Sequence, residues 1–120
     1  MAIPIRGNTG LGSYFITSAS SQRKFVLQGS IMCNLLLEVL FEYRDQNKYL
    51  LHEFVIMPNH VHMLLTPIET LEKAVALIKG GFSYRAKKEL GFGGEIWESS
   101  FHDWRVRDWA EYCHYRDYIS

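Results

Sequence analysis

The chain has 120 residues, of which 48% are hydrophobic and 22% charged, and 13 basic residues balance 13 acidic ones. This length suits one compact domain and is too short for two, and the apolar content can bury a core without disulfides or a structural metal. A net charge of zero excludes a uniformly basic surface, so a nucleic-acid partner would have to be met by a local patch.

The sequence also lacks the marks of a membrane or secreted protein. The longest apolar stretch, residues 31–40, is interrupted by Asn34 and Glu38 and is much shorter than the roughly 20 residues of a membrane span. The N-terminus lacks the basic start and apolar run of a secretory signal. Cys33 and Cys113 show no C-x-x-C spacing and are expected to be ordinary buried thiols. We therefore expect a soluble, cytoplasmic protein.

The first third of the chain predicts an arm, a strand and a helix. Residues 6–12 are glycine-rich and are expected to form a leading arm. Residues 14–18 are aromatic and β-branched, which favours a strand. Residues 30–47 form an amphipathic pattern that predicts a helix capped by Ser30. Its apolar residues at four-residue steps are Ile31, Leu35, Val39 and Tyr43.

The middle of the chain predicts two strands and a second helix. Residues 50–57 and 60–66 are strand-like, and Pro58-Asn59 between them suits a tight reversal. Thr70 is a favourable N-cap for a helix that continues to about Leu90. The pair Gly80-Gly81 weakens this helix, and no local feature of the sequence explains it.

The last part of the chain predicts a loop at 91–94, a short strand at 104–106, and a helix capped by Asp108 that runs to the end. The resulting order, β-α-β-β-α-(β)-α, predicts an α+β fold with an antiparallel sheet and helices packed on one face.

His60 and His62 are the candidate metal ligands. Histidines two residues apart on a strand project from the same face, so the two imidazoles can meet one cation. Val61 would then point into the core, and the histidines would lie on the open face of the sheet. A surface histidine pair without a ligand is the alternative. A histidine-triad hydrolase would need a third histidine where Leu64 stands, and the metallo-β-lactamase and amidohydrolase patterns or lengths are absent.

At these residues the sequence resembles the single-tyrosine HUH transposases, in particular the REP-associated tyrosine transposases and the IS200-like transposases. The most specific match is the block Met57-Pro58-Asn59-His60-Val61-His62-Met63-Leu64-Leu65. Supporting matches are Tyr14-Phe15-Ile16-Thr17, Gln22-Arg23, Ile78-Lys79, Trp97-Glu98, Phe101-His102-Asp103, Arg105-Val106-Arg107-Asp108 and Tyr115-Arg116-Asp117-Tyr118-Ile119. The resemblance covers nearly the whole chain, which we take as a single HUH transposase-like domain, residues 1–120.

The resemblance implies a ferredoxin-like or RRM-like antiparallel sheet. It also implies a divalent cation (Mg²⁺ or Mn²⁺) bound by His60 and His62, and a nucleophilic tyrosine on the last helix. By its motif that tyrosine is Tyr118, with Tyr115 as the second candidate and Tyr84 as the third. The activity implied is nicking and rejoining of single-stranded DNA through a 5′-phosphotyrosine intermediate. A packing role for each tyrosine is the alternative.

In that family the last helix continues past the tyrosine, often into an Asn-Pro-Val segment, and a side chain one turn further can complete the metal site. Here the sequence ends at Ser120. We therefore expect either a C-terminally truncated domain or a third ligand from elsewhere, and His102 and Asp103 have suitable chemistry.

The candidate DNA-binding residues are basic. They are Arg23, Lys24, Lys79, Arg85, Lys87, Lys88, Arg105 and Arg107. They can contact the phosphates of a single strand or hairpin, or they can form solvated helix faces paired with Glu72 and Glu89. Likewise, the three aromatic residues Trp97, Phe101 and Trp104 can stack on unpaired bases or fill the core.

The sequence thus favours a DNA-nicking enzyme that acts as a monomer or homodimer. A non-catalytic single-stranded nucleic-acid-binding module on the same fold is the alternative, and a domain that binds only a protein partner is the third.

Overall fold

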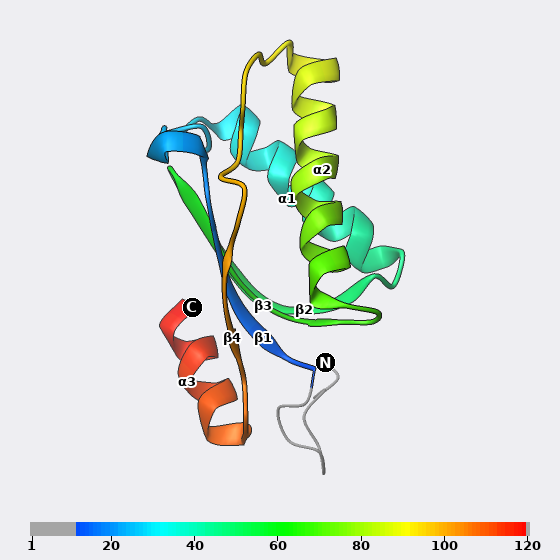
Figure 1. The fold of residues 1–120 in the computed structure, drawn as a ribbon, viewed down its shortest axis with the longest axis vertical. Helices are drawn as coiled ribbons and strands as arrows, with labels where there is room; N and C mark the ends of the chain where they lie inside the picture. Colours follow the sequence, from blue (N-terminus) through cyan, green and yellow to red (C-terminus); the bar gives the residue numbers. More distant parts are fainter. Residues whose placement is uncertain (1–11, 120) are drawn as a thin grey trace.

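The structure, a computed structural model, describes residues 12–119. Its centre is a four-stranded sheet of β1 (Tyr14–Ala19), β2 (Tyr49–Met57), β3 (His60–Pro67) and β4 (His102–Arg105), as Figure 1 shows. The strands lie in the order β2-β3-β1-β4, and each neighbouring pair is antiparallel. The predicted leading arm lies outside the described residues except for Gly12.

Three helices cover the two faces of this sheet. α1 (Ser30–Asp45) and α2 (Leu71–Leu90) pack on one face, and α3 (Trp109–Ile119) lies on the opposite face (Figure 1). The predicted α+β, ferredoxin-like class is confirmed. The prediction that the helices pack on one face and leave the other open was wrong for α3, because the sequence does not show on which side of the sheet the last helix packs. None of the helices in residues 12–119 is long and apolar enough to cross a bilayer.

The alternation of side chains along β3 separates a core face from a site face. Val61, Met63 and Leu65 are buried in the main core beneath α1 and α2. Leu64 instead belongs to a smaller core beneath α3. His60 and His62 have the same parity as Leu64, so they lie on the α3 face of the sheet.

The helix starts are only partly as predicted. The Thr70 side chain accepts a hydrogen bond from the Lys73 amide at 3.1 Å, and the Asp108 carboxylate accepts one from the Glu111 amide at 2.9 Å. Both predicted caps are confirmed. The Ser30 cap was wrong: Ser30 is the first residue of α1, and the N-cap position is Gly29, with no side-chain hydrogen bond. Ile31, predicted to be apolar-facing, is 67% exposed on this first turn.

The glycine pair in α2 has a tertiary reason. A Cβ on Gly81 would lie 2.7 Å from the Tyr43 hydroxyl oxygen, whereas a Cβ on Gly80 would meet nothing within 4 Å. Tyr43 packs against the main core from α1. Gly81 therefore allows the close approach of α1 and α2, and Gly80 serves no packing purpose.

Alanine substitution is expected to separate the two glycines. Gly80→Ala should raise the free energy of unfolding by about 0.5–1 kcal/mol, because alanine suits a helix interior better than glycine. Gly81→Ala should not show this gain, since the new methyl group displaces the Tyr43 ring. Urea denaturation of both variants measures the difference, and equal stabilisation by both substitutions would contradict this account of Gly81.

Candidate active site

The two histidines of β3 face each other across one residue. The Nε2 atoms of His60 and His62 are 3.2 Å apart, and the ring centroids are 4.7 Å apart with an interplanar angle of 80°. Two nitrogens that bind one cation at ~2.1 Å each, at roughly a right angle, lie about 3 Å apart. The separation in the structure therefore fits a shared cation.

Each imidazole is oriented by a hydrogen bond at its other nitrogen. His60 Nδ1 donates to the Asn59 side-chain oxygen at 2.8 Å, because that oxygen can only accept. His62 Nδ1 lies 2.9 Å from the Thr17 hydroxyl on the adjacent strand β1. Such partners fix ring orientation at metal sites and direct the free nitrogen toward the ion.

The electrostatic environment favours the neutral form of both rings. Burial lowers the pKa of His60, and the charge of Arg23 lowers it further. Burial and then the neighbouring His60 lower the pKa of His62. A neutral imidazole is the form that binds a metal, so the pair is suited to this role at neutral pH.

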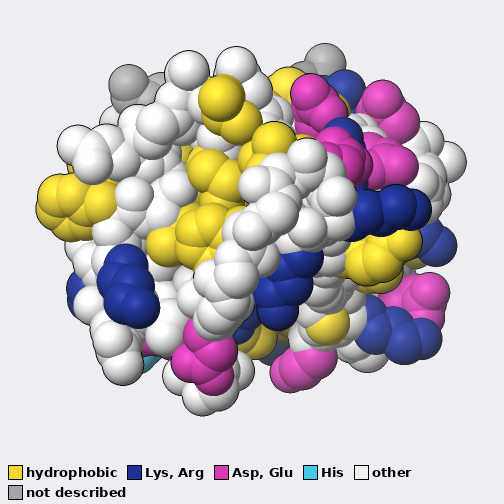
Figure 2. All heavy atoms as spheres, turned by 90° about the horizontal axis from the view of Figure 1, so that it is seen from above, with side chains coloured by type: hydrophobic (Ala, Val, Ile, Leu, Met, Phe, Trp, Pro, Cys, Tyr) yellow, Lys and Arg dark blue, Asp and Glu magenta, His cyan; other side chains and the backbone are white. Residues whose placement is uncertain are grey.

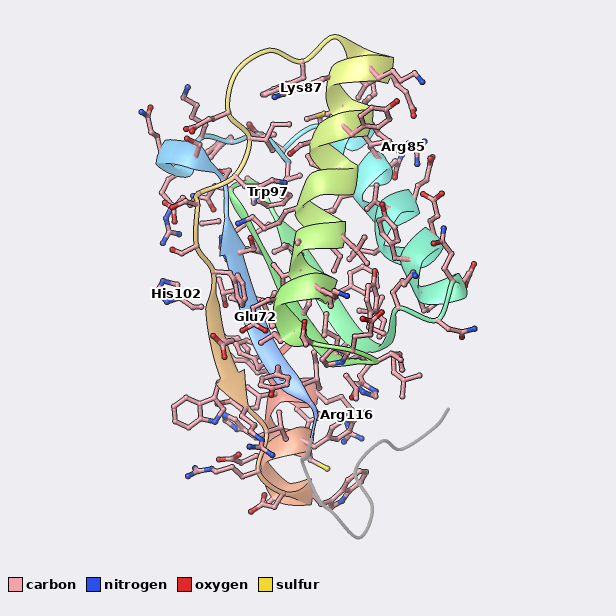
Figure 3. All side chains as sticks on the ribbon, turned by 45° about the vertical axis from the view of Figure 1, so that its right-hand side comes forward. Glu72, Arg85, Lys87, Trp97, His102 and Arg116 are labelled. Atoms are coloured by element: carbon pink, nitrogen blue, oxygen red, sulfur yellow. The ribbon has the colours of Figure 1, made fainter. Side chains whose placement is uncertain are left out.

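Among the described residues, no third metal-binding side chain joins the pair. Within residues 12–119, no group of three or more His, Cys, Asp or Glu side chains is placed to hold one ion. Thr17 on β1 is paired with His62 on one side and with His102 on the other. His102 is therefore two strand spacings, about 10 Å, from His62. Figure 3 shows His102 projecting from β4 on the side away from α2. Asp103 pairs with Ile16 and has the parity of the other face.

α3 brings a tyrosine to the histidine pair. The Tyr118 ring lies edge-on to His62, with 5.9 Å between centroids, and its side chain remains 64% exposed. Phe15 lies beneath both, 5.4 Å from His62 and 5.9 Å from Tyr118. The predicted tyrosine thus reaches the predicted histidines, and its exposure leaves it accessible to a large substrate.

The second candidate tyrosine occupies a more packed position. The Tyr115 ring stacks on Phe15 at 4.5 Å, and burial raises the pKa of its phenol. Tyr84 lies on α2, on the other side of the sheet. Of the three candidates, Tyr118 is the one in ring contact with a histidine of the pair.

A small second core and a polar network hold α3 in place. Leu64, Val106, Tyr112 and Ile119 are buried between the sheet and α3. His52, at a bulge of β2, lies edge-on to Tyr112 at 5.3 Å, and its Nε2 is 2.9 Å from the Thr66 hydroxyl. The position of Tyr118 therefore depends on contacts made up to two helical turns earlier in α3.

The predicted basic residues do not gather around the histidines. Lys79, Arg85, Lys87 and Lys88 belong to α2, on the opposite side of the sheet, where Figure 3 shows Arg85 and Lys87. Arg85 is paired with Glu38 and Glu89 at 2.8 and 2.6 Å. Viewed from the end at which α2 finishes, the basic side chains are scattered among acidic, hydrophobic and uncharged surface (Figure 2).

The basic residues nearer the site come from three other segments. Arg23 and Lys24 follow β1 and are exposed. Arg107 precedes α3 and is paired with Glu111 at 2.6 Å. Arg105 is paired with Tyr14, which packs against the main core, so its side chain projects from the sheet face that α1 and α2 cover. Only the first two are placed close to His60 by the backbone, because β1 ends opposite that residue.

The aromatic candidates differ in exposure. Trp97 lies edge-on to Phe82, and its indole N–H donates to the Lys79 carbonyl at 3.2 Å, so it fills the core (Figure 3). Phe101 is half-buried against the same core. Trp104 is 48% exposed on β4, and the Arg107 guanidinium lies over its ring, 5.5 Å from the centroid.

The sequence did not indicate that Asn59 and Thr17 orient the two imidazoles, or that Phe15 supports His62 from the neighbouring strand. Asn59 directly precedes the histidines, so its position carried a signal. The role of Thr17 follows from the pairing of β1 with β3, which no local pattern encodes.

Known proteins resemble this chain in sequence and in structure. Residues 11–120 match the family described as IS200-like transposase. A solved structure described as a REP-associated tyrosine transposase bound to a REP hairpin has a TM-score of 0.74 at 21% identity, covering 99% of this chain and 70% of that one. A candidate transposase from Deinococcus radiodurans R1 has a TM-score of 0.66 at 26% identity, covering 89% and 87%. No curated protein matches the chain.

His52 is expected to make the fold sensitive to acid. Burial lowers its pKa to about 4, below the usual 6.5, so protons bind preferentially to the unfolded chain between these values. The free energy of unfolding should be at its full value above pH 6.5 and should decrease as the pH falls from 6.5 to about 4. Allowing for partial exposure, the loss is about 1–2 kcal/mol.

The acid sensitivity attributed to His52 is tested by comparing the original chain with the variant His52→Gln. Glutamine can still hydrogen-bond to Thr66 but does not titrate. Thermal unfolding at pH 7 and pH 4.5 should show a smaller acid loss in this variant than in the original chain. The same loss in both proteins would exclude His52 as a source of acid sensitivity.

Proposed function

Because the chain belongs to the family of IS200-like transposases, we propose that it nicks and rejoins single-stranded DNA through a 5′-phosphotyrosine intermediate. The family match supports a transposase. The hairpin-bound structure of a relative supports single-stranded or hairpin DNA as the partner. The observation that carries the chemical proposal is the contact of Tyr118 with the histidine pair on one face of the sheet.

His60 and His62 would hold the divalent cation through their Nε2 atoms. When bound, a divalent cation polarises a phosphate and stabilises the negative charge that develops during attack. Mn²⁺ accepts imidazole ligands more readily than Mg²⁺, and both remain candidates. Asn59 and Thr17 keep the two rings directed at this position.

Tyr118 would supply the nucleophile. Its phenolic oxygen attacks the phosphorus of a DNA phosphodiester and loses its proton, a bond to the phosphorus forms, and the bond from phosphorus to the 3′-oxygen of the preceding nucleotide breaks. That 3′-oxygen takes up a proton and leaves as a free hydroxyl. Attack by a 3′-hydroxyl on the phosphotyrosine reverses the step and joins DNA without ATP, because the phosphoester bond is retained in the enzyme–DNA link.

The position of Tyr118 suits this role better than that of Tyr115. Tyr118 is exposed and touches His62, whereas the Tyr115 ring is stacked flat on Phe15. A scissile phosphate at the histidine pair can therefore be approached by the Tyr118 hydroxyl without disrupting the second core.

A covalent complex is expected with a labelled, hairpin-bearing single strand and Mn²⁺. Tyr118→Phe should abolish this complex, because the attacking oxygen is removed while the ring is kept. Tyr115→Phe is the matched control on the same helix and should retain it. Denaturing gel electrophoresis detects the complex, and its persistence in Tyr118→Phe would show that another residue is the nucleophile.

Metal affinity is expected to depend on the histidine pair and its supports. His60→Ala and His62→Ala should eliminate specific Mn²⁺ binding in titration calorimetry. Thr17→Val should weaken it roughly 10–100-fold by freeing the His62 ring. His102→Ala, on the same sheet face but two strands away, is the control and should bind as the original chain does. Unchanged binding in both histidine variants would favour the non-catalytic nucleic-acid-binding module.

A further inference from the structure

The turn that follows β1 has an unusual backbone for its sequence. Gln22 and Arg23 have φ angles of +54° and +56°, and the Lys24 amide donates to the Ser21 carbonyl at 3.2 Å. Two central residues with positive φ and a hydrogen bond across four residues characterise a type I′ turn, in which asparagine and glycine are favoured. A long polar side chain and a basic one hold these positions here, at a conformational cost.

The segment before the turn is fixed to the residues that precede the histidine pair. Ser20 is fully buried, and its amide and hydroxyl both donate to the Asn59 carbonyl, at 3.0 and 3.1 Å. The Ser20 hydroxyl has a single hydrogen, which it shares between the Asn59 carbonyl and the Lys24 carbonyl, the latter at 2.5 Å. The Ser21 amide donates to the Ile96 carbonyl at 2.8 Å.

The segment after the turn is fixed as well. Leu27 is buried, and its amide donates to the Pro58 carbonyl at 2.9 Å. Hydrogen bonds before and after the turn thus hold Gln22 and Arg23 in a backbone conformation that their side chains disfavour. A conformation that is costly and over-determined in this way is found mainly at functional sites.

The anchored turn displays four consecutive exposed side chains. They are Gln22, Arg23, Lys24 and Phe25, and Phe25 is 60% exposed. The ion pair of Arg23 with Glu98 is long, at 3.9 Å between two well-exposed side chains. Within residues 12–119, Lys24 has no ion pair within 4.0 Å. The two charges are therefore available to a ligand.

The turn lies at the His60 end of the pair. Ala19, the last residue of β1, is opposite His60, and the turn begins two residues later. Tyr118 lies at the other end, against His62 and Phe15. A nucleic-acid strand with one phosphate at the pair would therefore pass the turn on one side and α3 on the other.

We propose that the turn from Gln22 to Phe25 binds the unpaired nucleotides that flank the phosphate at the histidine pair. Arg23 and Lys24 contact the backbone phosphates, and the Phe25 ring stacks on a base. Cations beside an exposed aromatic ring suit single strands, because the bases of a duplex are already stacked on one another. The position of the flanked phosphate rests on the proposed function, but the binding itself needs neither the metal nor the tyrosine.

Binding is measured by fluorescence anisotropy in the presence of EDTA. The probe is a fluorescein-labelled single strand of mixed sequence, on the order of twenty nucleotides, and the same strand annealed to its complement. Arg23→Gln and Lys24→Gln should each weaken single-strand binding several-fold. Each should also reduce the slope of log affinity against log salt by about 0.7, the value for one phosphate contact.

Phe25→Ala should weaken single-strand binding roughly tenfold and leave the salt slope unchanged, because stacking releases no counterions. Lys48→Gln and Tyr84→Ala are the matched controls. Both side chains are exposed, and neither belongs to the turn: Lys48 lies between α1 and β2, and Tyr84 lies on α2. Arg23→Gly suits a positive φ, so it should raise the melting temperature while weakening binding, which separates loss of binding from loss of fold.

Single-strand binding that is equal in the turn variants and in the controls would overturn the proposal. Equal weakening of duplex binding by Phe25→Ala would overturn the stacking role. The outcome is independent of the proposed reaction: a covalent complex can form in a protein whose turn variants bind normally. Conversely, the turn variants can lose binding in a protein that forms no complex.

Discussion

Two hydrogen bonds on the outer nitrogens of two imidazoles are the constraint on which the site depends. Asn59 holds His60 and Thr17 holds His62, so that both Nε2 atoms point at one position, 3.2 Å apart. Without these bonds each ring could rotate about its side-chain torsions, and spacing on the strand alone would not produce a metal site. The metal site that we propose would therefore depend on the pairing of β1 with β3 as much as on the histidines themselves.

The same sheet face receives α3, and this gives the site its second component. The helix is held by a core of four buried residues and by the contact between Tyr112 and His52. Tyr118 lies in the last turn of the helix, touching His62 while remaining exposed. A helix that is packed at its start and exposed at its end would suit the nucleophilic role that we propose for Tyr118.

Much of this arrangement could be predicted from the sequence, because its strongest signals are local. The strand parity of His60 and His62, the Pro58-Asn59 reversal and the helix caps at Thr70 and Asp108 all follow from short patterns, and the family is confirmed. The face chosen by α3, the pairing of Thr17 with His62 and the reason for Gly81 could not be predicted. These features depend on contacts between segments far apart in the sequence. Such contacts produce no regular spacing of apolar or polar residues from which they could be predicted.

The most direct test of the central claim is a crystal structure with Mn²⁺ and a single-stranded oligonucleotide, using anomalous scattering to locate the metal. The account predicts one manganese peak bonded to Nε2 of both His60 and His62, with a DNA phosphate beside it and the Tyr118 hydroxyl facing that phosphate. A peak bonded elsewhere, or imidazoles turned apart with the tyrosine directed away, would contradict it.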